Sequence, residues 1–114
     1  MHHRNKVDAP SGTALMLGEA AAKGKGKSLS ELKGAVREGT FGTRERGSIG
    51  FASLRGGGIV GEHEVSFTSE SERISIKHEA FSRDIFVKGA IKAALWSKEK
   101  KPGLYDMLNV LSLR

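Results

Sequence analysis

The first six residues carry side chains that can move protons. Two adjacent histidines, His2 and His3, are followed three residues later by Lys6. Histidine titrates near neutral pH and can give or take a proton, and lysine can donate a proton or bind a carboxylate. Because this spacing lets the three side chains share one site in a loop or a helical turn, the segment predicts proton-transfer chemistry.

An anion site is predicted directly downstream, where Ser11, Gly12 and Thr13 precede a helical pattern. Unpaired backbone N–H groups, the helix dipole and two hydroxyls favour an anion there. Gly12 lets the backbone approach a ligand closely. With the histidines, this indicates an anionic substrate, of the carboxylate class, undergoing proton transfer. The alternative is plainer: the histidine pair is the remnant of a cloning tag, and Ser11 is an ordinary helix cap.

Other candidate motifs carry less chemistry. His63 and His78 fall on the apolar faces of predicted strands, which is typical of core histidines with hydrogen-bonded nitrogens. We expect no metal site, because adjacent histidines without suitably spaced carboxylates are a poor ligand set. Arg55 and the three glycines after it lack the pattern of a phosphate loop and predict a tight turn. No Gly-x-Gly-x-x-Gly motif follows a first strand, so the sequence predicts no dinucleotide-binding unit.

Composition narrows the class of protein. The 114 residues suffice for one domain, and the absence of cysteine excludes disulfides and thiolate metal sites. We expect a cytoplasmic protein that does not bind a membrane, because no apolar run approaches a membrane span. A net charge of +6 allows nucleic-acid binding as a less favoured alternative, since the chain has only one Trp, one Tyr and five Phe for stacking on bases.

Periodicity predicts helices at both ends of the chain and strands between them. Residues 14–23 form a helix capped by Ser11, residues 28–32 a helical turn with a capping box, residues 82–98 a long helix capped by Ser82, and residues 104–113 a partly helical segment. Strands are expected at residues 35–38, 48–54, 59–68 and 72–79, with a glycine-rich loop at residues 39–47. The predicted fold class is α+β, a small mixed or antiparallel sheet of about four strands with helices on one face.

The last two predicted strands alternate cleanly. His63, Val65 and Phe67 share one face, and Ile74 and Ile76 share the matching face of the next strand. Matching these faces requires a hairpin loop with an even number of residues, two or four. The pairing then sets two glutamates, Glu62 and Glu64, near Arg73 and Lys77. This charged face is expected either to be solvated or to meet a copy of itself.

The opening stretch, residues 2–14, closely resembles the signature of the dihydrodipicolinate reductase family. The resemblance continues, in the family's order, through blocks at residues 44–50, 61–67, 78–83, 86–90 and 103–107. It therefore covers nearly the whole chain. Thirteen contiguous signature residues and five ordered blocks make a far more specific signal than a single glycine motif.

The resemblance implies a function. Members of the family reduce a cyclic unsaturated dicarboxylate with NADPH or NADH in the diaminopimelate route to lysine, as homotetramers. By carry-over, His2 is the proton donor and acceptor, Lys6 is a proton donor, and His3, Gly12 and Thr13 bind substrate. Two further residues, Arg83 and Phe86, match positions beside the cofactor.

The resemblance also implies a division of the chain. Residues 1–82 correspond to the substrate-binding and oligomerisation domain, and residues 83–114 to a C-terminal helix and tail that return to the dinucleotide-binding domain. Since the chain lacks that domain, we expect it to be inactive alone and its cofactor to be held mainly elsewhere. An alternative is that the chain serves only as a catalytically silent assembly module.

Overall fold

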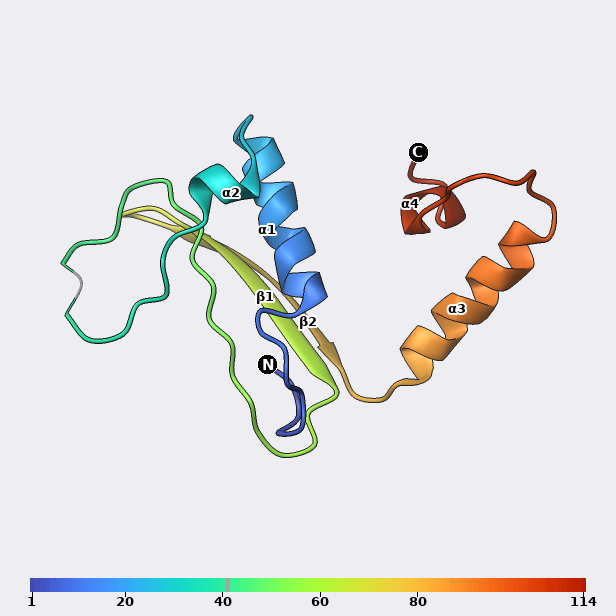
Figure 1. The fold of residues 1–114 in the computed structure, drawn as a ribbon, viewed down its shortest axis with the longest axis horizontal. Helices are drawn as coiled ribbons and strands as arrows, with labels where there is room; N and C mark the ends of the chain where they lie inside the picture. The colour runs from blue at the N-terminus through green and yellow to red at the C-terminus, as the bar shows by residue number, and fades with distance from the viewer. Residues whose placement is uncertain (41) are drawn as a thin grey trace. The chain divides into compact units, whose positions relative to one another are not determined.

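The computed structural model describes residues 1–40 and 42–114, and these divide into two compact units (Figure 1). The first unit is Met1–Glu79 and the second is Ala80–Arg114. Each unit is described by itself. No helix of the described residues is long and apolar enough to cross a membrane.

The first unit contains two helices that begin at serine caps. Helix α1, Gly12–Gly24, starts after Ser11, whose hydroxyl accepts a hydrogen bond from the Ala14 amide at 3.2 Å. It ends at the glycine-rich turn, where Gly26 has a φ of +68° that glycine adopts easily. Helix α2, Leu29–Leu32, starts at the predicted capping box, in which Glu31 accepts from the Ser28 amide at 2.8 Å. Both helices are confirmed close to their predicted bounds.

A hairpin of two strands, β1 (Gly61–Thr68) and β2 (Arg73–Ala80), forms the sheet. Its loop has four residues and is closed by the Ser69 amide, which donates to the Glu72 carbonyl at 2.9 Å. The even loop length is confirmed. The expected pairing of charges across the strands also occurs, since Lys77 lies 3.1 Å from the Glu62 carboxylate.

The predicted strands at residues 35–38 and 48–54 are wrong, and the described residues form two strands instead of about four. The two segments run as irregular chain with isolated bridges, between Lys33 and Ile49 and between His2 and Arg55. Three glycines within residues 39–47 adopt positive φ, which breaks an extended ladder. Phe41, within that predicted loop, lies outside the described residues. The α+β class itself is confirmed.

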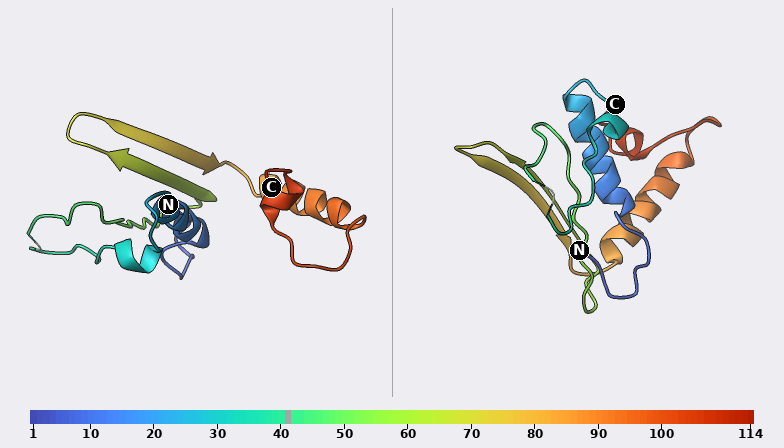
Figure 2. Two further views of the ribbon diagram at one scale, coloured as in Figure 1. Left: turned by 90° about the horizontal axis from the view of Figure 1, so that it is seen from above. Right: turned by 60° about the vertical axis from the view of Figure 1, so that its left-hand side comes forward.

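Only one strand of the hairpin is covered within the first unit. Helix α1 packs against α2 and β1, and Figure 2 shows it along one side of the hairpin. His63 and Val65 on β1 are half-buried as a result. On β2, however, Ile74 and Ile76 are 60% and 63% exposed. The prediction that His78 is a core residue is wrong, because no element of this unit covers β2 at that point.

The second unit is helical. Helix α3 (Asp84–Ser97) and the short α4 (Met107–Val110) border an open surface pocket of about 420 Å³, which is lined in part by Trp96, Tyr105 and Val110. The predicted cap at Ser82 is displaced by one residue: its hydroxyl accepts from the Asp84 amide, but the helix begins after Arg83. No residue of α3 is buried, so its predicted apolar stripe lies open in this unit.

Among the glycines of the described residues, Gly18 of α1 leaves the least room for a side chain. A Cβ there would lie 2.5 Å from Cζ of Phe51 and 3.3 Å from Cδ1 of Leu29. Glycine is therefore required at this buried position for a steric reason, although alanine is the better helix former by about 1 kcal/mol.

We expect Gly18→Ala to lower the free energy of unfolding by about 1–3 kcal/mol, because the added methyl overpacks the helix against Phe51. The matched control is Gly24→Ala, where the methyl would meet no atom within 4 Å, and here we expect no loss of stability. Urea denaturation followed by circular dichroism measures both. Equal stabilities for the two variants would contradict the packing at Phe51.

Candidate functional site

The first two residues are held by backbone hydrogen bonds on both sides. On one side the His2 amide donates to the Leu54 carbonyl at 3.1 Å, and the Gly56 amide donates to the His2 carbonyl at 3.0 Å. On the other side the Met1 amino group donates to the Glu62 carbonyl at 2.6 Å, and the Glu62 amide donates back at 2.9 Å. The backbone at His2 is therefore fixed between an irregular segment and β1.

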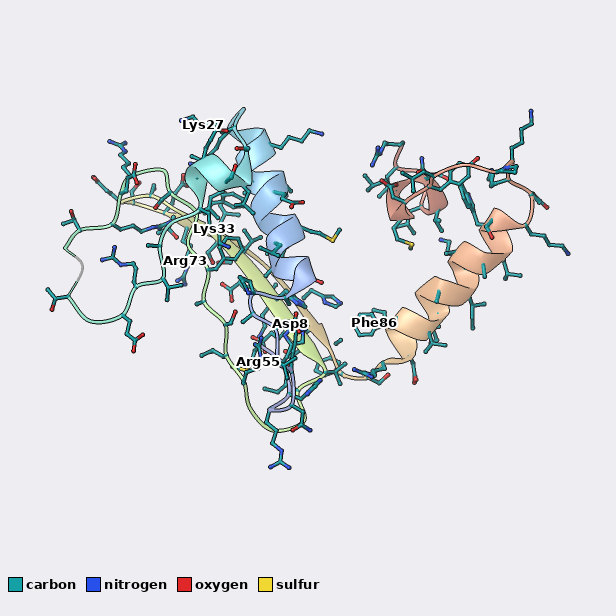
Figure 3. All side chains as sticks on the ribbon, viewed as in Figure 1. Asp8, Lys27, Lys33, Arg55, Arg73 and Phe86 are labelled. Carbon is teal, nitrogen blue, oxygen red and sulfur yellow. The ribbon has the colours of Figure 1, made fainter. Side chains whose placement is uncertain are left out.

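Arg55 holds the loop that follows. Its guanidinium donates to three backbone carbonyls: Leu54 at 2.8 Å, Lys6 at 3.2 Å and Asp8 at 2.5 Å. Figure 3 shows Arg55 and Asp8 beside each other at this loop. A planar guanidinium can serve several acceptors at once in a fixed geometry. Arg55 thus fixes the loop that carries Lys6.

Lys6 is paired with Asp8. Its ammonium lies 2.6 Å from the Asp8 carboxylate, and its side chain is 21% exposed against 61% for Asp8. The hydrogen bond from Lys6 lowers the pKa of Asp8, which stays ionised at neutral pH. Since an ammonium has three N–H donors, Lys6 keeps two of them for another partner.

Two imidazole rings meet behind the N-terminal segment. The ring centroids of His2 and His63 are 4.9 Å apart with an interplanar angle of 69°, an edge-to-face contact. Burial, followed by the nearby His63, lowers the pKa of His2. Burial also lowers the pKa of His63, with further contributions from the α-amino group, His78 and Lys6. Both rings are therefore neutral at neutral pH.

The start of α1 is open. A Cβ added at Gly12 would meet no atom within 4 Å, and both Gly12 and Thr13 are exposed. Their amides precede the first intrahelical hydrogen bond, which Leu15 donates to Ser11. This is the geometry expected of an anion site. Ser11 links it to the rings, because its hydroxyl lies 3.1 Å from Nε2 of His63.

The structure therefore places five of the predicted site residues in one segment of the first unit. His2, His3 and Lys6 lie on the N-terminal loop, and Gly12 and Thr13 begin the helix after it. The two remaining residues, Arg83 and Phe86, belong to the second unit, at the start of α3. Phe86 is 52% exposed there. Their assignment to a cofactor stays a prediction.

Sequence reasoning missed two residues of this site, since Arg55 was assigned only to a tight turn and His63 only to the core. Ser11 was predicted as a helix cap and as part of an anion site, but its contact with His63 was not predicted. The hydrogen bond between the Ser11 hydroxyl and Nε2 of His63 does confirm that one nitrogen of His63 has a partner. The strand alternation around His63 placed it on the helix-facing side, but the sequence held no signal that His2 would reach the same place.

The described residues offer no set of side chains that could bind a metal ion. In residues 1–40 and 42–114, no three His, Asp or Glu side chains gather in a group that would hold a metal ion. The site is instead a pair of neutral rings beside Lys6 and Arg55.

Comparison with known proteins identifies the family. Residues 1–111 match the family model described as "Dihydrodipicolinate reductase, C-terminus". The chain belongs to this family. The family resemblance stated from the sequence motifs is thereby confirmed.

Curated relatives agree. A 4-hydroxy-tetrahydrodipicolinate reductase of Allorhizobium ampelinum is 61% identical over 113 residues, which are 99% of this chain and 42% of that protein. Proteins of the same name from Dinoroseobacter shibae and Brucella abortus are 59% and 58% identical, over 98% and 99% of this chain, again covering 42% of each relative. The chain thus spans about 42% of the length of the curated relatives it matches.

We expect Arg55→Lys to release the Lys6 loop, because a lysine ammonium cannot reproduce the three divergent hydrogen bonds of the guanidinium. The loss should be about 2 kcal/mol, which corresponds to amide exchange about 30-fold faster at His2 and at Arg4, whose amide donates to the Gly57 carbonyl at 3.1 Å. Hydrogen exchange measured by NMR tests this. The matched control is Arg73→Lys, at the exposed start of β2 (Figure 3), which should leave these amides protected. Unchanged exchange in Arg55→Lys would show that Arg55 does not hold the loop.

Proposed function

We propose that this chain is the substrate-binding and oligomerisation part of an NAD(P)H-dependent 4-hydroxy-tetrahydrodipicolinate reductase. Such an enzyme would reduce dihydrodipicolinate to tetrahydrodipicolinate on the route to diaminopimelate and lysine. The observation that carries the proposal is the family match over residues 1–111, joined to a geometry that suits the chemistry. An open helix start for a carboxylate lies in the same short segment as a histidine and a lysine that can exchange protons.

We assign the site residues as follows. Gly12 and Thr13 offer backbone amides to one substrate carboxylate at the start of α1, and His3 contributes to binding. Lys6, which keeps free N–H donors beside Asp8, donates a proton to the substrate ring, and His2 serves as proton donor and acceptor. The cationic side chains Lys6 and Arg55 stabilise the dianionic ligand through their charge.

The cofactor is the finer part of the proposal. A nicotinamide dinucleotide, NADPH or NADH, supplies the hydride when it is bound. Within this chain, Arg83 and Phe86 offer one guanidinium and one exposed aromatic ring at the start of α3, which suits a contact at the edge of such a molecule. Residues 1–40 and 42–114 include no glycine-rich strand–turn–helix unit that would hold its pyrophosphate. We therefore assign the main binding of the cofactor to a part of the enzyme outside this chain.

Assembly is supported by the sheet. The apolar side chains Ile74 and Ile76 of β2 are exposed in the first unit, and the opposite face carries charges such as the Glu62–Lys77 pair. An open apolar face on an outer strand favours association with a further chain. We propose that this hairpin contributes to a homotetramer, the assembly that the family resemblance implies. A cytoplasmic location, without a membrane or nucleic-acid partner, also remains our prediction.

The function is tested in a chimeric reductase, in which this chain replaces the matching 113 residues of the Allorhizobium ampelinum protein. We expect the chimera to oxidise NAD(P)H with dihydrodipicolinate, and the chain alone to show no turnover. Lys6→Ala should lower kcat by about 10²–10⁴-fold, the usual cost of losing a general acid. The matched control, Lys98→Ala, changes a lysine at the end of α3 and should keep kcat. A folded but inactive chimera, or equal effects of the two substitutions, would contradict the assignment.

Assembly is tested by sedimentation of the chain. We expect Ile76→Lys to shift the protein toward smaller species, because it places a charge in the exposed apolar face of β2. Glu70→Lys, at an exposed polar residue of the hairpin loop, is the control and should leave the assembly intact. If both variants sediment as the unmodified chain does, the β2 face is not the assembly surface.

A further inference from the structure

We propose that His63 is a positioning residue for His2, and that Ser11 sets the tautomer of His63, so that His2 is presented as a neutral, oriented ring beside the start of α1. The group consists of three residues from three segments: the N-terminal loop, the cap of α1 and strand β1. The structural part of this inference stands on hydrogen bonds and ring geometry. Its catalytic meaning rests on the proposed function, in which His2 exchanges a proton with the substrate.

The first step is the hydrogen bonding of Ser11. This residue is buried, with 7% of its surface exposed, and its hydroxyl oxygen accepts from the Ala14 amide at 3.2 Å. The hydroxyl proton remains available for one further partner. The acceptor within reach is Nε2 of His63, at 3.1 Å. The cap of α1 therefore directs a donor at His63.

The second step assigns the tautomer of His63 from this network. If Nε2 accepts a hydrogen bond from the hydroxyl, Nε2 is unprotonated, and the neutral ring carries its proton on Nδ1. A protonated ring would instead donate from Nε2. The Ser11 oxygen would then accept two hydrogen bonds, and the Ser11 hydroxyl proton could no longer bond to Nε2 of His63. The capping bond from Ala14 thereby favours the neutral form of His63.

The third step is the contact between the rings. His63 meets His2 edge to face at a centroid distance of 4.9 Å. This arrangement is favourable for neutral rings and unfavourable for two imidazolium cations. Gly61 closes the space beside them, since a Cβ there would lie 3.4 Å from Nε2 of His2 and 3.7 Å from Cε1 of His63. The orientation of His2 therefore depends on His63.

The charges around the rings act in the same direction. The positive groups that act on His2 are the Met1 ammonium, Lys6 and Arg55, and those that act on His63 are the Met1 ammonium, His78 and Lys6. Each of them disfavours a further positive charge on the ring. The first turn of α1 carries no acidic residue, and Asp8 is paired with Lys6. On β1 itself, Glu62 and Glu64 alternate to the other face of the strand, where Glu62 pairs with Lys77. Burial adds to these effects and lowers the pKa of both histidines.

In the proposed reaction, the arrangement gives His2 a defined resting state. A neutral His2 accepts a proton, and a dicarboxylate placed at the start of α1 would raise its pKa by opposite charge. Proton uptake by His2 would then accompany substrate binding. His63 touches neither the substrate nor the cofactor in this scheme, so that its effect passes through His2 alone.

The first test needs no variant. Long-range ¹H–¹⁵N spectra of the labelled chain report which ring nitrogen of each histidine carries the proton. We expect His63 to be neutral at pH 7 with the proton on Nδ1. A proton on Nε2, or a charged ring at pH 7, would overturn the role of Ser11.

The second test is a pH titration of the histidine Cε1 protons. In the unmodified chain His2 should titrate below 6.5, its ordinary value. In His63→Asn its midpoint should rise toward that value, because both the burial and the neighbouring ring are lost. His78→Asn, on the exposed face of β2, is the matched control and should leave the His2 midpoint in place. An unmoved His2 midpoint in a folded His63→Asn chain would overturn the proposal.

Ser11 is tested separately by a pair of substitutions. Ser11→Ala should raise the midpoint of His63, because the neutral ring loses its donor, and Ser11→Thr should restore it, because threonine keeps the hydroxyl and caps helices. A purely structural role for Ser11 would lower stability without moving the midpoint. If His63→Asn fails to fold, this pair still decides the inference: equal His63 midpoints in Ser11→Ala and Ser11→Thr overturn it.

The effect of His63 on catalysis is tested in the chimeric reductase. His63→Asn should lower kcat by about 10²-fold, as a misplaced catalytic group does, and move the acidic limb of the pH profile. His78→Asn should do neither. If the unmodified chimera is inactive, the proposed function is contradicted, while the ring titrations remain valid. If the unmodified chimera is active and its His63→Asn variant has the same pH profile, the positioning role of His63 is contradicted.

Discussion

The candidate site depends on the two-sided backbone pairing of residues Met1 and His2. An irregular segment keeps one conformation only where its contacts compensate the entropy of fixing it. Here four backbone hydrogen bonds tie these residues to Glu62 on one side and to the segment from Leu54 to Gly56 on the other. The pairing places the His2 ring against His63 and aligns the next residues for Arg55. Without it, nothing would fix the positions of the histidine and the lysine relative to His63 and the start of α1.

The electrostatics of the site follow from the same framework. The Arg55 guanidinium donates to backbone carbonyls, and the Lys6 ammonium donates one hydrogen bond to Asp8. Both positive charges are therefore held in place, and neither is fully neutralised. A fixed cation loses little further entropy when an anion arrives, and this is how preorganised sites stabilise charge. The open amides of Gly12 and Thr13 add a partial positive charge from the helix dipole. An anion is therefore the ligand that this arrangement stabilises most.

Local signals in the sequence predicted the local structure well. Ser11 as a cap, the box at Ser28 and Glu31, and the four-residue hairpin loop are each determined by neighbouring residues, and each occurs. The predicted strands at residues 35–38 and 48–54 were wrong because a short β-type segment does not itself supply a pairing partner, and the glycines between them adopt positive φ. His63 lies 52 residues from Ser11, so no periodicity within either segment could reveal their contact. The fold class came from local patterns, whereas the site came from the tertiary arrangement.

The small core explains why the two units expose so much apolar surface. Among the described residues, only Ala22, Ala80 and Val110 are buried hydrophobic side chains, and two of the three are alanines. Burial of so little apolar area offsets only a small part of the conformational entropy of 114 residues. The open faces of β2 and α3 carry the large aliphatic side chains that a core would need. Within each unit, these side chains therefore contribute little to the free energy of folding. The N-terminal site differs from these faces, because its hydrogen bonds close within the first unit.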